Sequence, residues 1–246
     1  MVQSATVDRA PGKAHLSRAF FMAFALVVAA LVLAGFTRTF FLPLARGTFT
    51  APWFVYVHGS LFCTWVGLLT AQSALVARRR TATHRRLGRV ALALIPLMIA
   101  SGVAVAIWSS VRDFDRGGGD AAVSLFGGEL IDMLVFGTLA AAALLMRLHS
   151  ASHKRLIALA TLVLLGAAVG RIPVIGLAAN YLVAALLLCL AGYDLRTRST
   201  IHVTTAVGGV LLLIDMFASP FLGATPRWQA VGRQLLGVAT RYHSAG

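Results

Sequence analysis

The amino-acid sequence predicts an all-α polytopic membrane protein, a bundle of seven transmembrane helices in one domain. Of the 246 residues, 59% are hydrophobic and only 12% are charged, a composition far from that of a soluble domain. The apolar runs are continuous and long enough for helices, which need about 20 residues to cross a bilayer. Strands of a membrane barrel would alternate apolar and polar residues instead. The lipid bilayer is therefore the first partner that the sequence predicts.

The basic side chains agree with this class. The formal net charge is +14, but the arginines and lysines fall mainly between the apolar runs. There they set the topology and contact anionic headgroups, so we exclude a nucleic-acid-binding role. The loops alternate in charge, and the richest one holds Arg78, Arg79, Arg80, Arg85, Arg86 and Arg89. The positive-inside rule then predicts a cytoplasmic N-terminus and an external C-terminus.

The elements follow in chain order. Residues 1–18 are polar and lack the apolar core and cleavage site of a signal peptide, so we interpret them as a cytoplasmic tail. The transmembrane bundle is predicted over residues 19–222. Its seven spans are expected near residues 19–36, 53–77, 87–109, 122–146, 156–170, 174–192 and 201–221.

Some residues within and between the spans carry further predictions. Pro96 predicts a kink in the third span. The Arg171-Ile172-Pro173 break separates the fifth span from the sixth, because one helix over both would exceed a single bilayer crossing. Lys154 and Arg155 are assigned to the cytoplasmic loop before the fifth span.

The last segment, residues 223–246, predicts an amphipathic helix at the membrane interface. Thr225 and Pro226 are typical of an N-cap followed by the first helical position. Beyond them, apolar residues such as Trp228 and Leu235 alternate with basic ones such as Arg233. This pattern is typical of a helix that lies in the plane of the membrane surface.

Small residues and cysteines lie inside the predicted spans. Gly166 and Gly170 are four residues apart and favour close helix packing, within the chain or in a homo-oligomer. Cys63 and Cys189 both lie in the middle of a span. We interpret them as buried thiols rather than as a disulfide.

Ionisable residues inside the spans are the strongest functional signal. Glu129, Asp132 and Asp215 lie in apolar runs, where a charge costs about 3 kcal/mol or more. Such residues usually line a bundle interior, a cavity or a pathway. The helix rise places them, together with His58, Arg171 and Asn180, in the outer half of the membrane. Glu129 and Asp132 share a helix face.

A polar stripe follows the second span. His58, Trp65 and Gln72 recur every seven residues and therefore lie on nearly the same helix face. The stripe predicts a polar lane, one wall of a cofactor pocket, or a face bonded to neighbouring helices.

The outer cluster predicts three kinds of site. One imidazole with several carboxylates suits a divalent first-row metal, with His58, Glu129, Asp132 and Asp215 as ligands. The same acids would suit proton carriers or a cation site, because their charges exceed that of Arg171. A buried ionic network that fixes helix packing around Arg171 is the third interpretation.

Histidines at the cytoplasmic helix ends raise the question of haem. A b-type haem needs two axial histidines from different helices at one depth. His84, His153 and His202 are the candidates, and the alternative is that they lie beside lipid headgroups.

Part of the sequence resembles a known family. The pattern consists of Arg46-Gly47-Thr48-Phe49, Ala51-Pro52, His58-Gly59, Trp65, Gln72 and His84-Arg85-Arg86-Leu87-Gly88, followed by His153-Lys154-Arg155-Leu156 and Gly170-Arg171. Over residues 40–175 it is similar to a family of uncharacterised bacterial multi-pass inner-membrane proteins. The resemblance implies a bacterial inner-membrane location and no established activity. A fainter likeness, through His58 and His84, is to the ascorbate-reducible b-type cytochromes, although no partner histidine lies near His58.

Three functions follow as hypotheses. The first is a metal- or haem-dependent redox site or a small-molecule site in the outer half of the bundle. The second is a proton-coupled transporter that uses the same acids. The third is a non-catalytic membrane scaffold with a structural ionic network. Whether the protein is an enzyme stays open.

Overall fold

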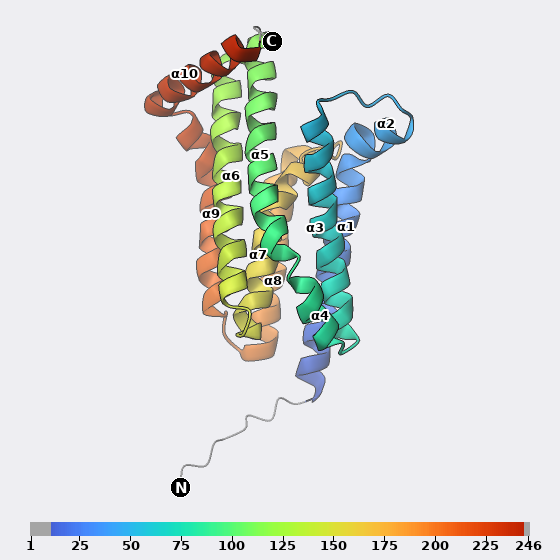
Figure 1. Ribbon diagram of the computed structural model, residues 1–246. Helices are drawn as coiled ribbons and strands as arrows, with labels where there is room; N and C mark the ends of the chain where they lie inside the picture. The colour runs from blue at the N-terminus through green and yellow to red at the C-terminus, as the bar shows by residue number, and fades with distance from the viewer. Residues whose placement is uncertain (1–10, 244–246) are drawn as a thin grey trace.

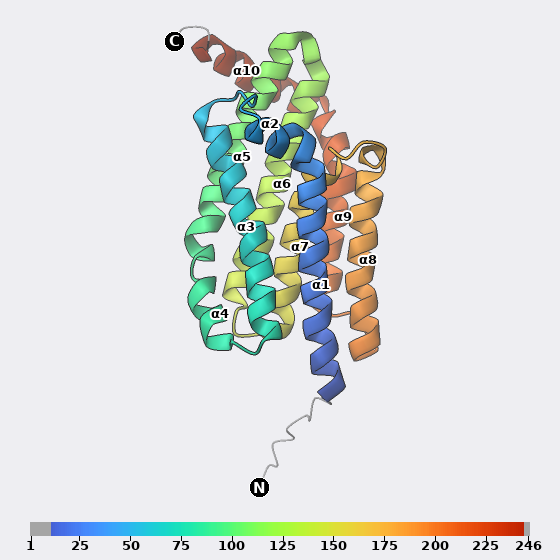
Figure 2. The same cartoon turned by 90° about the vertical axis from the view of Figure 1, so that its right-hand side faces the viewer.

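The computed structural model describes residues 11–243, and all regular structure in that range is helical. Its long helices lie side by side along one axis (Figures 1 and 2). They are α1 (Pro11–Phe36), α3 (Trp53–Ala77), α5 (Ala91–Asp113), α6 (Gly119–Leu145), α7 (Ser150–Val169), α8 (Ala179–Arg198) and α9 (Val203–Gly223). We call the end where α1 begins the base of the bundle and the opposite end the top. The last helix, α10 (Pro226–His243), lies at the top (Figure 1).

Six helical stretches in the described residues are long and apolar enough to cross a membrane. One of them, Ala91–Leu145, contains both α5 and α6, joined by a kinked π-helical turn, η2 (Phe114–Gly118). Gly117 turns the chain there with φ 88°, in the left-handed region that favours glycine. The structure is therefore that of an all-helical membrane protein.

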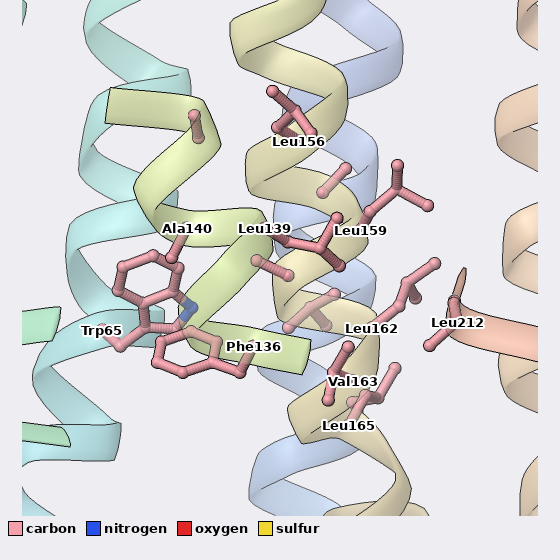
Figure 3. Close-up of a cluster of buried hydrophobic side chains, with 14 of the residues drawn as sticks. Trp65, Phe136, Leu139, Ala140, Leu156, Leu159, Leu162, Val163, Leu165 and Leu212 are labelled. Atoms are coloured by element: carbon pink, nitrogen blue, oxygen red, sulfur yellow. The ribbon is translucent and has the colours of Figure 1, made fainter. Parts of the chain in front are cut away.

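The apolar side chains divide into an interior and an outward face. Large exposed residues are spread along the outside of the helices and include Leu26, Leu33, Leu92, Leu97, Leu134, Leu188, Val207 and Phe217. A surface of this kind suits lipid. The interior is centred on α7, which packs against α1, α6, α8 and α9. Figure 3 shows its buried leucines between Phe136 of α6 and Leu212 of α9.

Several boundaries differ from the sequence prediction. α1 begins at Pro11, inside the predicted tail, and residues 1–10 of that tail lie outside the described residues. The arginine-rich loop forms a separate helix, α4 (Thr81–Gly88), and α5 consequently begins later than expected. Pro96 lies inside α5, and the kink expected there stays a prediction. The break after α7 is also confirmed, since Arg171 and Pro173 lie between α7 and α8.

Short elements at the top were not predicted. The connection from α1 to α3 contains a π-helical turn, η1 (Thr37–Phe41), and a four-residue helix, α2 (Leu42–Ala45). A 3₁₀ turn, η3 (Gly176–Ala178), precedes α8.

The C-terminal helix begins as the sequence predicts. The Thr225 hydroxyl oxygen accepts a hydrogen bond from the backbone N–H of Trp228 at 3.4 Å, and Pro226 is the first helical residue. α10 packs against α5 and α6. The Trp228 indole donates to the Val123 carbonyl at 2.8 Å, and Arg233 pairs with Asp120 at 3.1 Å. Residues 244–246 lie outside the described part.

The predicted glycine contact is wrong within this chain. A Cβ at Gly166 would meet nothing within 4 Å, and one at Gly170 would meet only the Gly166 carbonyl of its own helix. The close approach occurs instead where Gly35 of α1 lies against the backbone of Ala168 in α7. A homo-oligomer through Gly166 stays a prediction.

A buried ion pair holds the base of the bundle together. Arg155 of α7 is paired with Asp194 of α8, and the two side chains are 2% and 0% exposed. The second Asp194 oxygen accepts from the Thr205 hydroxyl at 2.6 Å and from the His202 backbone N–H at 3.1 Å. The prediction that Arg155 is a loop residue is therefore wrong, because α7 begins one and a half turns before it.

His202 gives this region a pH dependence. Its Nδ1 accepts a hydrogen bond from the backbone N–H of Thr204 at 3.1 Å and so caps α9. Burial, followed by the nearby Arg155 charge, lowers the pKa of His202. The folded protein thus resists protonation, which would remove the capping acceptor. In the unfolded chain His202 takes up a proton below the ordinary histidine pKa of about 6.5. The contribution of the His202 cap to the stability of the fold is therefore complete above the unfolded-state pKa. It is lost as the pH falls towards the lower pKa that His202 has in the folded protein.

We expect the melting temperature of the detergent-solubilised protein to fall between pH 7.5 and pH 5. The matched variant is His202→Asn, because asparagine also caps helices but does not titrate. Its melting temperature should fall less over the same range. An identical fall in the parent and in the variant would show that His202 is not the source of the pH dependence.

Candidate small-molecule site

A cavity of about 410 Å³ lies in the upper half of the bundle. It is enclosed by α1, α3, α5, α6 and α7 and by the connection between α1 and α3. Most of its lining is apolar and much of that is aromatic, with Phe36, Phe40, Phe41, Phe49, Phe62, Trp65 and Trp108. These helices come together because each turns an apolar face inward.

The connection from α1 to α3 covers the cavity. Phe40 and Phe49 line it, with ring centroids 5.1 Å apart. The Tyr56 hydroxyl donates to the Phe49 carbonyl at 2.7 Å and fixes the connection to α3. Phe40 lies over Gly59, where a Cβ would come within 2.7 Å of the ring. Glycine at this position thus allows the Phe40 ring, which together with Phe49 forms the aromatic cover of the cavity, to pack against α3.

Predicted polar residues from three places in the chain meet in this cavity. His58 comes from α3, Glu129 and Asp132 from α6, and Arg171 from the end of α7. His58 and Asp132 are half-buried, whereas Glu129 and Arg171 are exposed. The cavity therefore has an apolar body and an accessible polar edge.

Arg171 is held in place without a carboxylate partner. Its guanidinium stacks on the Phe36 ring at 4.9 Å and donates to the Ala167 carbonyl. Glu129 is close enough to interact with it electrostatically. Among the ion pairs of the described residues, however, none within 4.0 Å joins Arg171 to an acid.

His58 and Trp65 play different parts in the lining. The Nδ1 atom of His58 is buried and has no hydrogen-bond partner among the described residues. Trp65 is 3% exposed, and its indole N–H donates to the Thr161 hydroxyl at 3.2 Å. The Trp65 ring meets Phe136 edge to face (Figure 3). Trp65 is thus fixed by its neighbours, and His58, which interacts with the Ser101 backbone, adds a polar side chain to the lining.

Asp215 lies behind the cavity rather than in its lining. It comes from α9, is 4% exposed, and interacts with Asp132 across α6 and α9. Its Oδ1 atom is buried without a hydrogen-bond partner among the described residues. The two acids thus form a pair that extends from the cavity into the bundle.

Two predicted site residues lie elsewhere. Asn180 is exposed on α8 and donates to the Met216 carbonyl of α9 at 3.1 Å. Gln72 donates to the His84 carbonyl at 3.1 Å and so joins α3 to α4 at the base. Of the predicted stripe, His58 and Trp65 line the cavity and Gln72 does not.

The geometry does not support the predicted metal site. The described residues contain no group of three or more His, Cys, Asp or Glu side chains that could hold a metal ion. His58, Glu129, Asp132 and Asp215 therefore do not converge as ligands. His58, Glu129 and Asp132 line the cavity, and Asp215 lies outside its lining.

The three histidines predicted for haem come from α4, from α7 and from the cap of α9. His84 and His153 interact, but the His153 Nδ1 atom is bonded to the Ala143 carbonyl at 2.8 Å. Burial, followed by His153, lowers the pKa of His84. His202 is occupied as the cap of α9. A haem at the base stays a prediction.

Some lining residues were not predicted. Cys63, Ser109, Arg112 and Thr161 also line the cavity. Both cysteines are free and exposed, so the prediction of buried thiols is wrong. Arg112 stacks on Trp108 at 4.8 Å and pairs with Asp113 at 2.9 Å. A small polar residue inside an apolar helix gives little signal by itself, because such residues often bond only to their own backbone.

No family model, curated protein or solved structure shows significant similarity to the chain, so the site is interpreted from its geometry alone.

Proposed function

We propose that the protein is a membrane-embedded binding protein for a small molecule with an apolar body and a polar head. The observation that carries this proposal is the cavity, an apolar chamber with His58, Glu129 and Arg171 at one edge. Ligand pockets typically measure about 300–1,000 Å³ and combine apolar walls with a few polar groups. The cavity volume of about 410 Å³ falls in that range.

The proposal includes seven membrane crossings. At about 1.5 Å per residue, α5 and α6 are each long enough to cross a hydrocarbon core about 30 Å thick. They run side by side, and α1 begins at the end of the bundle opposite α10 (Figures 1 and 2). The arginines of α4 lie at the base, which supports a cytoplasmic base and an external top. On the family resemblance, the membrane is a bacterial inner membrane.

A second candidate function is proton-coupled transport of the bound molecule. It is favoured by the pairing of Asp132 with the buried Asp215. Two carboxylates repel each other in apolar surroundings, so a proton held by the pair is the favourable arrangement. The scaffold hypothesis is less well supported, because the buried ion pair is Arg155–Asp194 at the base, far from Arg171.

Cys63 allows a direct test of the cavity. In a Cys189→Ala variant reconstituted into vesicles, a charged, membrane-impermeant methanethiosulfonate should modify Cys63 from the top face only. Val105→Trp should slow the modification about tenfold or more, because Val105 lines the cavity and an indole would fill much of it. Mass spectrometry of the intact protein gives the rate.

The matched control is Val207→Trp, because Val207 lies on α9 and is 66% exposed. It should leave the rate unchanged. Equal rates in the Val105→Trp and parent proteins would overturn the cavity assignment. Modification from the base alone would overturn the proposed orientation.

A further inference from the structure

The polar edge of the cavity carries both signs of charge. Arg171 supplies a guanidinium and Glu129 a carboxyl group, and both line the cavity and are exposed. They interact electrostatically but do not form an ion pair within 4.0 Å among the described residues. A gap is therefore left between a cationic and an acidic group.

Arg171 has donors to spare. A guanidinium carries five N–H groups in a planar fork. One face of it lies on Phe36, and the hydrogen bond that the structure gives it goes to the Ala167 carbonyl. The free edge suits a carboxylate, which arginine binds through two parallel hydrogen bonds. The unpartnered Nδ1 of His58 lies in the same lining.

The acidic side of the gap is arranged similarly. Glu129 and Asp132 lie on one face of α6, and both line the cavity. The Ser109 hydroxyl of α5 interacts with the Glu129 carboxyl group. Arg171 and Arg112 also act on Glu129 electrostatically, but neither forms an ion pair with it within 4.0 Å among the described residues. The Glu129 carboxyl group therefore remains able to accept hydrogen bonds from an ammonium group.

A ligand with one charge would pair with one side and displace water from the other without pairing it, which is costly. A ligand with both charges a few bonds apart would satisfy both sides. The apolar walls formed by Phe62, Val66 and Trp108 would then take an apolar side chain. The geometry points to a zwitterion with an aromatic or branched apolar side chain, of the α-amino acid class, as the ligand of this cavity. This inference rests on the proposed small-molecule function and specifies its substrate class.

Three compounds of nearly the same shape test the inference. L-phenylalanine carries both charges, 3-phenylpropionate lacks the amine, and phenethylamine lacks the carboxylate. Binding to the purified full-length protein in nanodiscs is measured by isothermal titration calorimetry. L-phenylalanine should bind, and each analogue should bind at least about tenfold more weakly, equivalent to about 1.4 kcal/mol.

Two variants assign the charges. Arg171→Gln should remove the advantage of L-phenylalanine over phenethylamine while phenethylamine binding is retained, which also reports that the variant is folded. Glu129→Gln should remove the advantage of L-phenylalanine over 3-phenylpropionate. Arg38→Gln, at an exposed arginine of η1 outside the lining, is the matched control and should change neither ratio.

The outcomes separate this inference from the proposed function. Equal binding of the three compounds, or binding of none, would overturn the zwitterion assignment, while slowed modification of Cys63 in Val105→Trp would still support the cavity. Failure of both experiments would overturn the proposed function itself.

Discussion

Asp194→Ala is expected to lower the free energy of unfolding by about 3–5 kcal/mol, because it leaves a buried charge without a partner. Arg155 is 2% exposed, and apart from Asp194 its guanidinium donates to the Ala151 carbonyl and lies over the Tyr193 ring, neither of which carries a compensating negative charge. The substitution also removes the acceptor for the Thr205 hydroxyl and the His202 backbone N–H. Contacts that join α7, α8 and α9 would be lost together. Equilibrium unfolding in mixed micelles measures the change.

Two further variants make this result specific. The pair Arg155→Leu and Asp194→Leu together should recover much of the loss, because well-packed apolar residues replace buried ion pairs at little cost. Arg233→Gln breaks a pair whose side chains are 52% and 69% exposed, and should cost less than about 1 kcal/mol. A loss in Asp194→Ala no larger than that in Arg233→Gln would contradict a structural role for the buried pair.

The sequence predicts the helices well because their limits depend on local hydropathy. The second predicted span, residues 53–77, is α3 with the same limits. Pro173 lies in the break between α7 and α8, and Pro226 is the first residue of α10. Both positions follow from the local effect of a proline ring on a helix. Asp194 was missed because it follows the predicted end of its span, so nothing distinguished it from an interfacial acid. Its burial depends on the late end of α8 and on Arg155 from another helix.

The site was only partly predictable, since sequence gives a helix face and an approximate depth but not the neighbouring helices. Gln72 shares a face with His58, yet fourteen residues separate them by about 21 Å along the axis. Gln72 therefore meets α4 at the base. Asn180 was expected seven residues into its span, but α8 begins only at Ala179 and packs against α7 and α9 rather than beside the cavity.

Part of the sequence pattern on which the family resemblance rests lines the same cavity, whereas Gln72 and His84 lie at the base. Phe49, Ala51, His58, Gly59 and Trp65 belong to that pattern, and all of them line it. Arg171, at the end of the pattern, closes its polar edge. Residues of this pattern therefore occur both in the aromatic cover and at the polar edge of the cavity.

Gly35→Ala is expected to destabilise the protein by about 1–3 kcal/mol, the usual cost of overpacking. Gly35 is buried in α1, and an added Cβ would collide with the backbone of Ala168 in α7. Backbone atoms cannot rotate away as a side chain can, so the two helices must separate. Thermal unfolding in detergent measures the effect.

Gly166→Ala is the matched control, because it lies on the same helix as Ala168 and its Cβ would meet nothing within 4 Å. Replacing a glycine inside a helix without a clash should stabilise by about 0.5–1 kcal/mol. The two glycine substitutions should therefore shift the melting temperature in opposite directions. A shift of the same sign in both would contradict the close contact between α1 and α7. Since Phe36 follows Gly35 and supports Arg171, the Gly35→Ala displacement should also weaken ligand binding at the polar edge.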